Sequence, residues 1–60
     1  MSSNNLIVVS NSKFTVTHND ADTGEVIELV GQCKNLEEAI NLAQKFQEEN
    51  IVEYGIHFIK

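Results

Sequence analysis

The sequence has no arginine and only four lysines, against nine aspartate and glutamate residues, so its 60 residues carry a formal net charge of −5. Binding to a nucleic-acid backbone requires a basic patch that neutralises phosphates. We therefore expect no direct contact with nucleic acid. The same charge favours contact with a basic surface on another protein, although it also serves simply to keep a small protein soluble.

Cys33 is the only cysteine, so no disulfide can form within the chain. A lone thiol is more typical of a reducing compartment than of secretion. The apolar run Leu6 to Val9 is too short for the core of a signal peptide, and a transmembrane helix needs about 20 apolar residues. These features predict a cytoplasmic protein that does not enter a membrane.

A chain of this length allows one domain, residues 1–60, and buries only about 60% of the surface that its unfolded form exposes. Such small domains compensate with disulfides, a metal ion or association with another chain. A structural zinc site needs four ligands, usually paired at close spacing. The candidates here, His18, Cys33 and His57, are widely spaced. We therefore expect no metal, and association is the remedy that remains.

The first half of the chain has the pattern of strands joined by turns. Met1 to Asn5 is polar, and we expect it to be disordered. Leu6 to Val9 forms either a separate strand or one bulged strand with Lys13 to His18, which alternates apolar and polar residues. Asn19 to Gly24 is rich in turn-forming residues. It should therefore join the second of these segments to a strand at Glu25 to Val30 in an antiparallel hairpin.

Asn35, followed three residues later by Glu38, resembles a capping box and predicts the start of a helix that ends near Asn50. Apolar residues recur at helical spacing and define the face that packs on the sheet: Leu36, Ala39, Ile40, Leu42, Ala43 and Phe46. Ile51 to Lys60 is predicted as the last strand. Its core-facing residues are predicted to be Val52, Tyr54, Ile56 and Phe58.

These elements predict an α+β domain in the order β-β-α-β, or with a further short strand before it. It would have a small antiparallel or mixed sheet of three or four strands and one helix packed on one face. No enzyme site or cofactor is expected. The segment from Asn19 to Glu25 superficially suggests a calcium loop, but Val30 stands where an EF-hand has its bidentate glutamate. The position of Cys33 before the helix is the only argument for a reactive thiol, and the nearby Glu37 and Glu38 oppose it. So short a chain also leaves little volume for a water-excluding pocket.

An acidic surface provides the leading functional hypothesis. We interpret the chain as a small non-enzymatic binding protein, an inhibitor or regulator that engages a basic surface of a nucleic-acid-handling partner. The analogy is with small anti-defence proteins of phages, and it rests on size and charge alone. The residues expected to contact such a partner are Glu37, Glu38, Glu48 and Glu49 on the helix, and Asp20 and Asp22 on the turn.

The alternative hypothesis is a structural or regulatory homo-oligomer. The strands contain more apolar residues than one helix covers, and exposed apolar strands commonly pair with another chain. We therefore expect a homodimer. The residues predicted to form the self-association surface are Leu6, Val8, Ile51 and Ile59.

Overall fold

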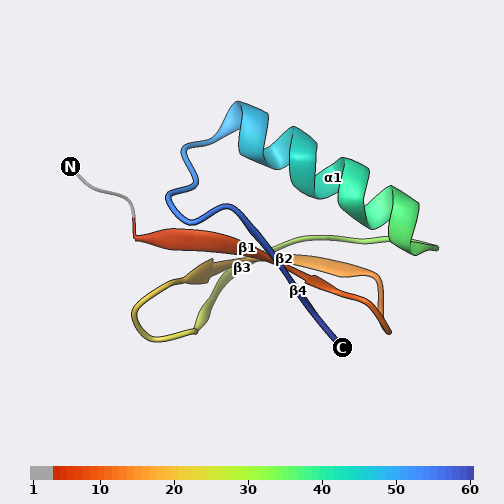
Figure 1. Cartoon of the computed structure of the whole chain (residues 1–60), viewed down its shortest axis with the longest axis horizontal. Coiled ribbons are helices and arrows are strands. Elements are labelled where there is room, and N and C mark those ends of the chain that lie inside the picture. Colours follow the sequence, from red (N-terminus) through yellow and green to blue (C-terminus); the bar gives the residue numbers. More distant parts are fainter. Residues whose placement is uncertain (1–3) are drawn as a thin grey trace.

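A computed structural model describes residues 4–60 of the chain. The elements follow in the order β1 (Asn5–Ser10), β2 (Thr15–Asp20), β3 (Val26–Gln32), α1 (Leu36–Glu49) and β4 (Ile56–Ile59). The strands form one mixed sheet in the order β3-β2-β1-β4, and α1 lies over one face of this sheet (Figure 1). The predicted α+β class, with one helix on a small sheet, is confirmed.

The apolar run at Leu6 to Val9 belongs to a strand of its own. A turn at residues 11–13 reverses the chain, and β1 pairs antiparallel with β2, with Val9 opposite Val16. The single bulged strand is therefore wrong, and the element order is β-β-β-α-β. Residues 1–3 of the segment expected to be disordered lie outside the described residues. Asn5, from the same segment, is buried and begins β1.

The predicted hairpin between β2 and β3 is confirmed, and its turn is held by side-chain hydrogen bonds. The Oδ1 atom of Asp20 accepts from the backbone N–H of Asp22 at 2.8 Å and from that of Thr23 at 3.2 Å. Gly24 closes the turn with a φ of 80°, a conformation that costs little only for glycine. Two register shifts, next to Thr17 and His18, interrupt the β2–β3 ladder.

The helix begins at the predicted cap. The Oδ1 atom of Asn35 accepts from the N–H of Glu38 at 2.8 Å, while the Glu38 carboxylate accepts from the N–H of Lys34 at 3.1 Å. The helix ends at Glu49, where the backbone and side-chain N–H groups of Asn50 donate to the carbonyl of Phe46. Within residues 4–60, no helix has the length and apolar character needed to cross a membrane.

The core lies between α1 and one face of the sheet. Its fully buried members are Ile7, Val9, Val16, Ala39 and Ala43. The two alanines allow the helix to approach the strands closely. Gly31 serves the same purpose on β3, because a Cβ atom there would lie 2.6 Å from a methyl group of Leu42. Leu36, Leu42 and Phe46 pack around this centre, as the helical spacing predicts.

The last strand is shorter than predicted, because only Ile56–Ile59 pairs, in parallel with β1. The main contacts of the helix are with β1, β2 and β3, and β4 lies at the edge of the sheet beside β1. The core positions predicted for Val52 and Ile56 are confirmed, since both pack against the buried cluster. The burial predicted for Tyr54 and Phe58 is wrong, since these side chains are 56% and 51% exposed, although Phe58 pairs with Val9 and so points to the predicted side of the sheet.

The buried side chain of Asn5 helps to hold the loop before β4 in place, together with backbone bonds from Tyr54 and to Gly55. The Nδ2 atom of Asn5 donates to the carbonyl of Ile51 at 3.0 Å, and its Oδ1 atom accepts from the N–H of Glu53 at 2.9 Å. The same Nδ2 atom lies 2.7 Å from Nε2 of His18, whose ring packs on Phe46. Asn5 thereby links β1, β2 and the loop from residue 51 to residue 55.

Replacing this side chain should destabilise the domain. We expect Asn5→Ala to lower the free energy of unfolding by about 2 kcal/mol, because two or three partly buried hydrogen bonds are lost at about 1 kcal/mol each. Urea denaturation measures this difference. The matched control is Asn11→Ala in the exposed β1–β2 turn, which should change stability by less than about 0.5 kcal/mol. Equal losses in the two variants would contradict the role of Asn5.

Candidate functional site

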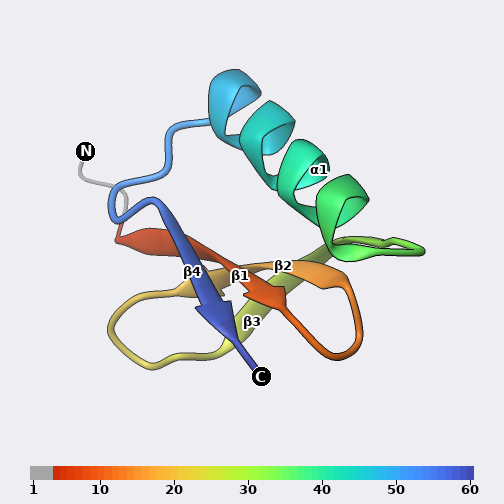
Figure 2. The same cartoon turned by 45° about the vertical axis from the view of Figure 1, so that its right-hand side comes forward.

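The sheet has one face covered by α1 and one face that α1 leaves open (Figure 2). Paired residues point to the same face of a sheet, and successive residues point to opposite faces. Ile7, Val9 and Val16 point toward α1, because they form the core with its alanines. Leu6 and Val8 therefore point away from the helix.

The strand registers extend this assignment across the sheet, and we call the resulting set the open face. Its members are Leu6, Val8 and Ser10 of β1; Thr15, Thr17 and Asn19 of β2; Val26, Leu29 and Gln32 of β3; and His57 and Ile59 of β4. None of these residues is aspartate, glutamate or lysine. Asp20 and Glu28, the acids within the ladders, pair with Asn5 and His18 and so belong to the helix side.

Two polar side chains of β2 on the open face form hydrogen bonds within the chain. The Thr17 hydroxyl donates to Oδ1 of Asn19 at 2.7 Å, and Nδ2 of Asn19 donates to the carbonyl of Gly24 at 3.2 Å. The two edge strands carry exposed apolar side chains, such as Leu29 at 62% and Ile59 at 52%, beside the polar Gln32 and His57. The open face therefore combines five apolar side chains with six uncharged polar ones, and the polar side chains of Thr17 and Asn19 are hydrogen-bonded within the chain.

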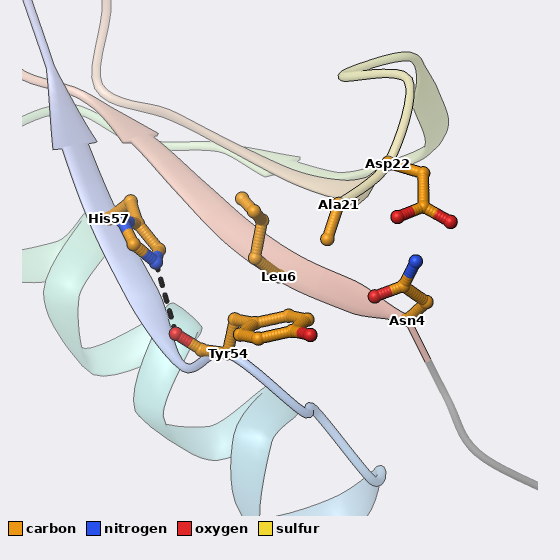
Figure 3. Close-up of a pocket in the computed structure, with 6 residues that line it drawn as sticks. All are labelled: Asn4, Leu6, Ala21, Asp22, Tyr54 and His57. Carbon is orange, nitrogen blue, oxygen red and sulfur yellow. Dashed lines mark hydrogen bonds between the residues drawn. The ribbon is translucent and has the colours of Figure 1, made fainter.

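A shallow hollow of about 330 Å³ lies at one end of the open face (Figure 3). Its lining residues are Asn4, Leu6, Ala21, Asp22, Tyr54 and His57. The imidazole Nε2 of His57 lies 3.0 Å from the carbonyl of Tyr54, so this nitrogen is engaged within the chain. The floor at Leu6 and the ring of Tyr54 suit an apolar or aromatic side chain from outside.

The structure separates the acidic residues that the sequence grouped together. All four helix glutamates are exposed, and Glu37 and Glu48 lie about three turns apart, so they share one stripe of α1 roughly 16 Å long. We call Glu37, Glu38, Glu48 and Glu49 the acidic ridge. The turn that carries Asp20 and Asp22 lies apart from α1 in both views (Figures 1 and 2). The six acids therefore do not form one surface.

Three of the four residues predicted for self-association lie together. Leu6, Val8 and Ile59 all belong to the open face. Ile51 does not, because it lies in the loop after α1, where its side chain is 78% exposed. Leu29, a member that the prediction missed, had only a weak signal in the sequence: its strand is rich in apolar residues, with four between Val26 and Val30.

The candidate metal ligands do not converge. His18 pairs with Ile7 on the helix side of the sheet, whereas His57 pairs with Val8 on the open face. Cys33 is half-buried at the end of β3. Across residues 4–60, no three or more histidine, cysteine, aspartate or glutamate side chains group in a way that could hold a metal ion.

Comparisons with protein-family models, with curated proteins and with solved structures found no match for this chain. The chemistry of its own surfaces therefore supports the functional proposals.

Proposed function

We propose that the chain is a non-enzymatic protein-binding module that contacts its partner through the open face. One observation carries this proposal. In a chain with a net charge of −5, the open face combines exposed apolar side chains with a lack of formally charged residues. Val26 and Leu29 on β3 and Ile59 on β4 are each more than half exposed.

The balance of energies on this face favours contact with a polypeptide. Burial of apolar surface stabilises a contact by about 25 cal/mol per Å², and covering a charged group that finds no partner opposes it. The open face offers apolar surface without the free-energy cost of covering an unpaired charged side chain. It also has no lysine with which to contact phosphate, so nucleic acid is a poor occupant.

The hollow at the end of the open face adds a place for an anchoring side chain. Affinity in protein interfaces is concentrated in a few large side chains that fill pockets near apolar surface. The hollow lies between Leu6 and the ring of Tyr54, next to the apolar strip of β1 (Figure 3). We infer that a partner inserts an aromatic or branched aliphatic side chain here.

Two neighbouring residues on β4 provide a matched test of the open face. Ile59 and Phe58 are 52% and 51% exposed, but they point to opposite faces of the sheet. The test immobilises each variant on a support and exposes it to a lysate of the cells that make the chain. We expect Ile59→Lys to lose the proteins that the wild-type chain binds, because a lysine ammonium would be buried at the contact. Phe58→Lys should retain them. Quantitative mass spectrometry of the bound fraction measures this, and equal losses for both variants would contradict the proposal.

The acidic ridge supports a second candidate function, capture of a basic protein surface. Glu48 and Glu49 occupy the last turn of α1, which has no basic residue. The helix dipole disfavours negative charge there by about 0.3–1 kcal/mol per residue before screening. A charge pattern that opposes local stability is typical of residues kept for function.

Stability and binding should change separately if the acidic ridge is functional. We expect Glu48→Lys with Glu49→Lys to raise the free energy of unfolding, by less than about 2 kcal/mol, because it complements the dipole. Glu37→Lys with Glu38→Lys should lower it, because it reverses favourable charges in the first turn and removes the Glu38 bond to Lys34. Urea denaturation measures both effects.

An increase in ionic strength should release a set of captured proteins from the wild-type chain. Both ridge variants should fail to capture these salt-sensitive proteins. The control is Glu25→Lys with Glu53→Lys, which makes the same change in net charge at exposed sites outside α1. The second candidate function would be refuted if the amount of captured protein changed in parallel with the free energy of unfolding. It would also be refuted if the control variant lost as much captured protein as the two ridge variants.

A further inference from the structure

We propose that the occupant of the open face is a second copy of this chain, packed sheet against sheet about a two-fold axis. This inference rests on the proposed function of the open face and names the partner. Two copies joined in this way would place their open faces together and both α1 helices on the outside. The acidic ridge of each copy would remain in water.

Charge is the first argument for a second copy. Two chains that each carry −5 repel one another, so a stable contact between them must avoid bringing carboxylates together. The helix side exposes four glutamates, Asp20 is half-buried at the end of β2, and Asp22 is exposed in the turn that follows. The open face lacks aspartate, glutamate and lysine, so two copies can meet there without burying a formal charge. Asp22 lines the hollow at one end of the open face, so this carboxylate lies beside the proposed contact.

The shortage of core is the second argument. Five apolar side chains are fully buried, whereas Val26, Leu29 and Ile59 of the open face are each more than half exposed. This chain has one cysteine and so no internal disulfide. A domain of this size also has too small a core to be very stable on its own. A second copy is the one partner whose concentration always equals that of the chain itself, so it can cover the exposed strands whenever the protein is made.

The dimensions of the sheet set the expected strength of the dimer. Four strands at about 4.8 Å spacing and six residues at about 3.3 Å rise give a footprint of roughly 400 Å² per copy. A standard stable interface buries about 800 Å² per partner. Facing sheets pack about 10 Å apart with interdigitating side chains, which adds to the flat footprint. We therefore expect a reversible dimer that depends on concentration.

Three substitutions at exposed positions test this packing against its alternatives. Leu29→Lys and Ile59→Lys lie on the open face at opposite edges of the sheet, and Phe58→Lys lies on the helix side. Each adds one positive charge to an acidic chain and so reduces the long-range repulsion between copies. A weaker dimer must then result from burying lysine at the contact itself.

Sedimentation equilibrium over the micromolar to millimolar range gives the dissociation constant of the dimer. We expect the wild-type chain to dimerise, Leu29→Lys and Ile59→Lys each to raise the dissociation constant at least about tenfold, and Phe58→Lys to change it less than about threefold; tenfold corresponds to about 1.4 kcal/mol. Circular dichroism establishes that each variant is folded. Because each replaced side chain is more than half exposed, we expect all three to fold.

Four results would overturn the inference. In the first, the wild-type chain stays monomeric throughout the concentration range. In the second, Phe58→Lys and Ile59→Lys weaken the dimer equally. In the third and fourth, only Leu29→Lys or only Ile59→Lys weakens the dimer. The last two would indicate strand pairing at the β3 or β4 edge. A monomeric chain that still loses captured proteins through Ile59→Lys would reject the second copy and retain the proposed function. A monomer with no such loss would reject both.

Discussion

The contact of Ala39 and Ala43 with the strands determines the rest of this molecule. Because these side chains are small and fully buried, α1 lies close to Ile7, Val9 and Val16. One helix is then enough to cover three strands, but only on one face. This single contact fixes which residues form the core, leaves the other face of the sheet without cover, and directs the helix carboxylates into water. Both proposed binding surfaces follow from it.

The elements with strong local periodicity could be predicted from the sequence. The helical spacing from Leu36 to Phe46 and the cap at Asn35 depend on residues within a few positions of one another, and local patterns contain that information. The structure places α1 where those patterns indicate. The hairpin of β2 and β3 was predictable for the same reason, because its turn residues are contiguous.

The end of the chain could not be predicted in the same way, because a distant residue determines it. The bonds from Asn5 to Ile51 and Glu53 join positions 46 and 48 residues apart. No local pattern reveals such bonds, and the alternation from Val52 to Phe58 suggests a continuous strand. With Asn5 holding this loop and Gly55 at a φ of 76°, pairing begins only at Ile56.

The open face was partly predictable, and bulges explain much of the remainder. Leu6, Val8 and Ile59 follow simple alternation within their strands. On β3, however, Val26 pairs with Asn19 and Leu29 with Thr17, so residues an odd number apart point to the same face. A register shift adds a residue to one strand, and counting alternate positions in the sequence then fails. Ile51 was misplaced because the counting of alternate positions ran through a loop.

The two proposed surfaces lie on opposite sides of the sheet, and their electrostatics distinguish them. Capture of a basic partner by the acidic ridge is an attraction between opposite charges, so dissolved salt weakens it. Pairing of open faces joins two acidic chains through uncharged surface, and salt screens the repulsion that opposes this pairing. Salt should therefore strengthen self-association while it weakens capture. A dimer would also double the number of acidic ridges in one particle, so a basic partner with two sites would bind with higher avidity. In the proposed dimer, pairing through the uncharged open faces would leave both acidic ridges available to the same basic partner.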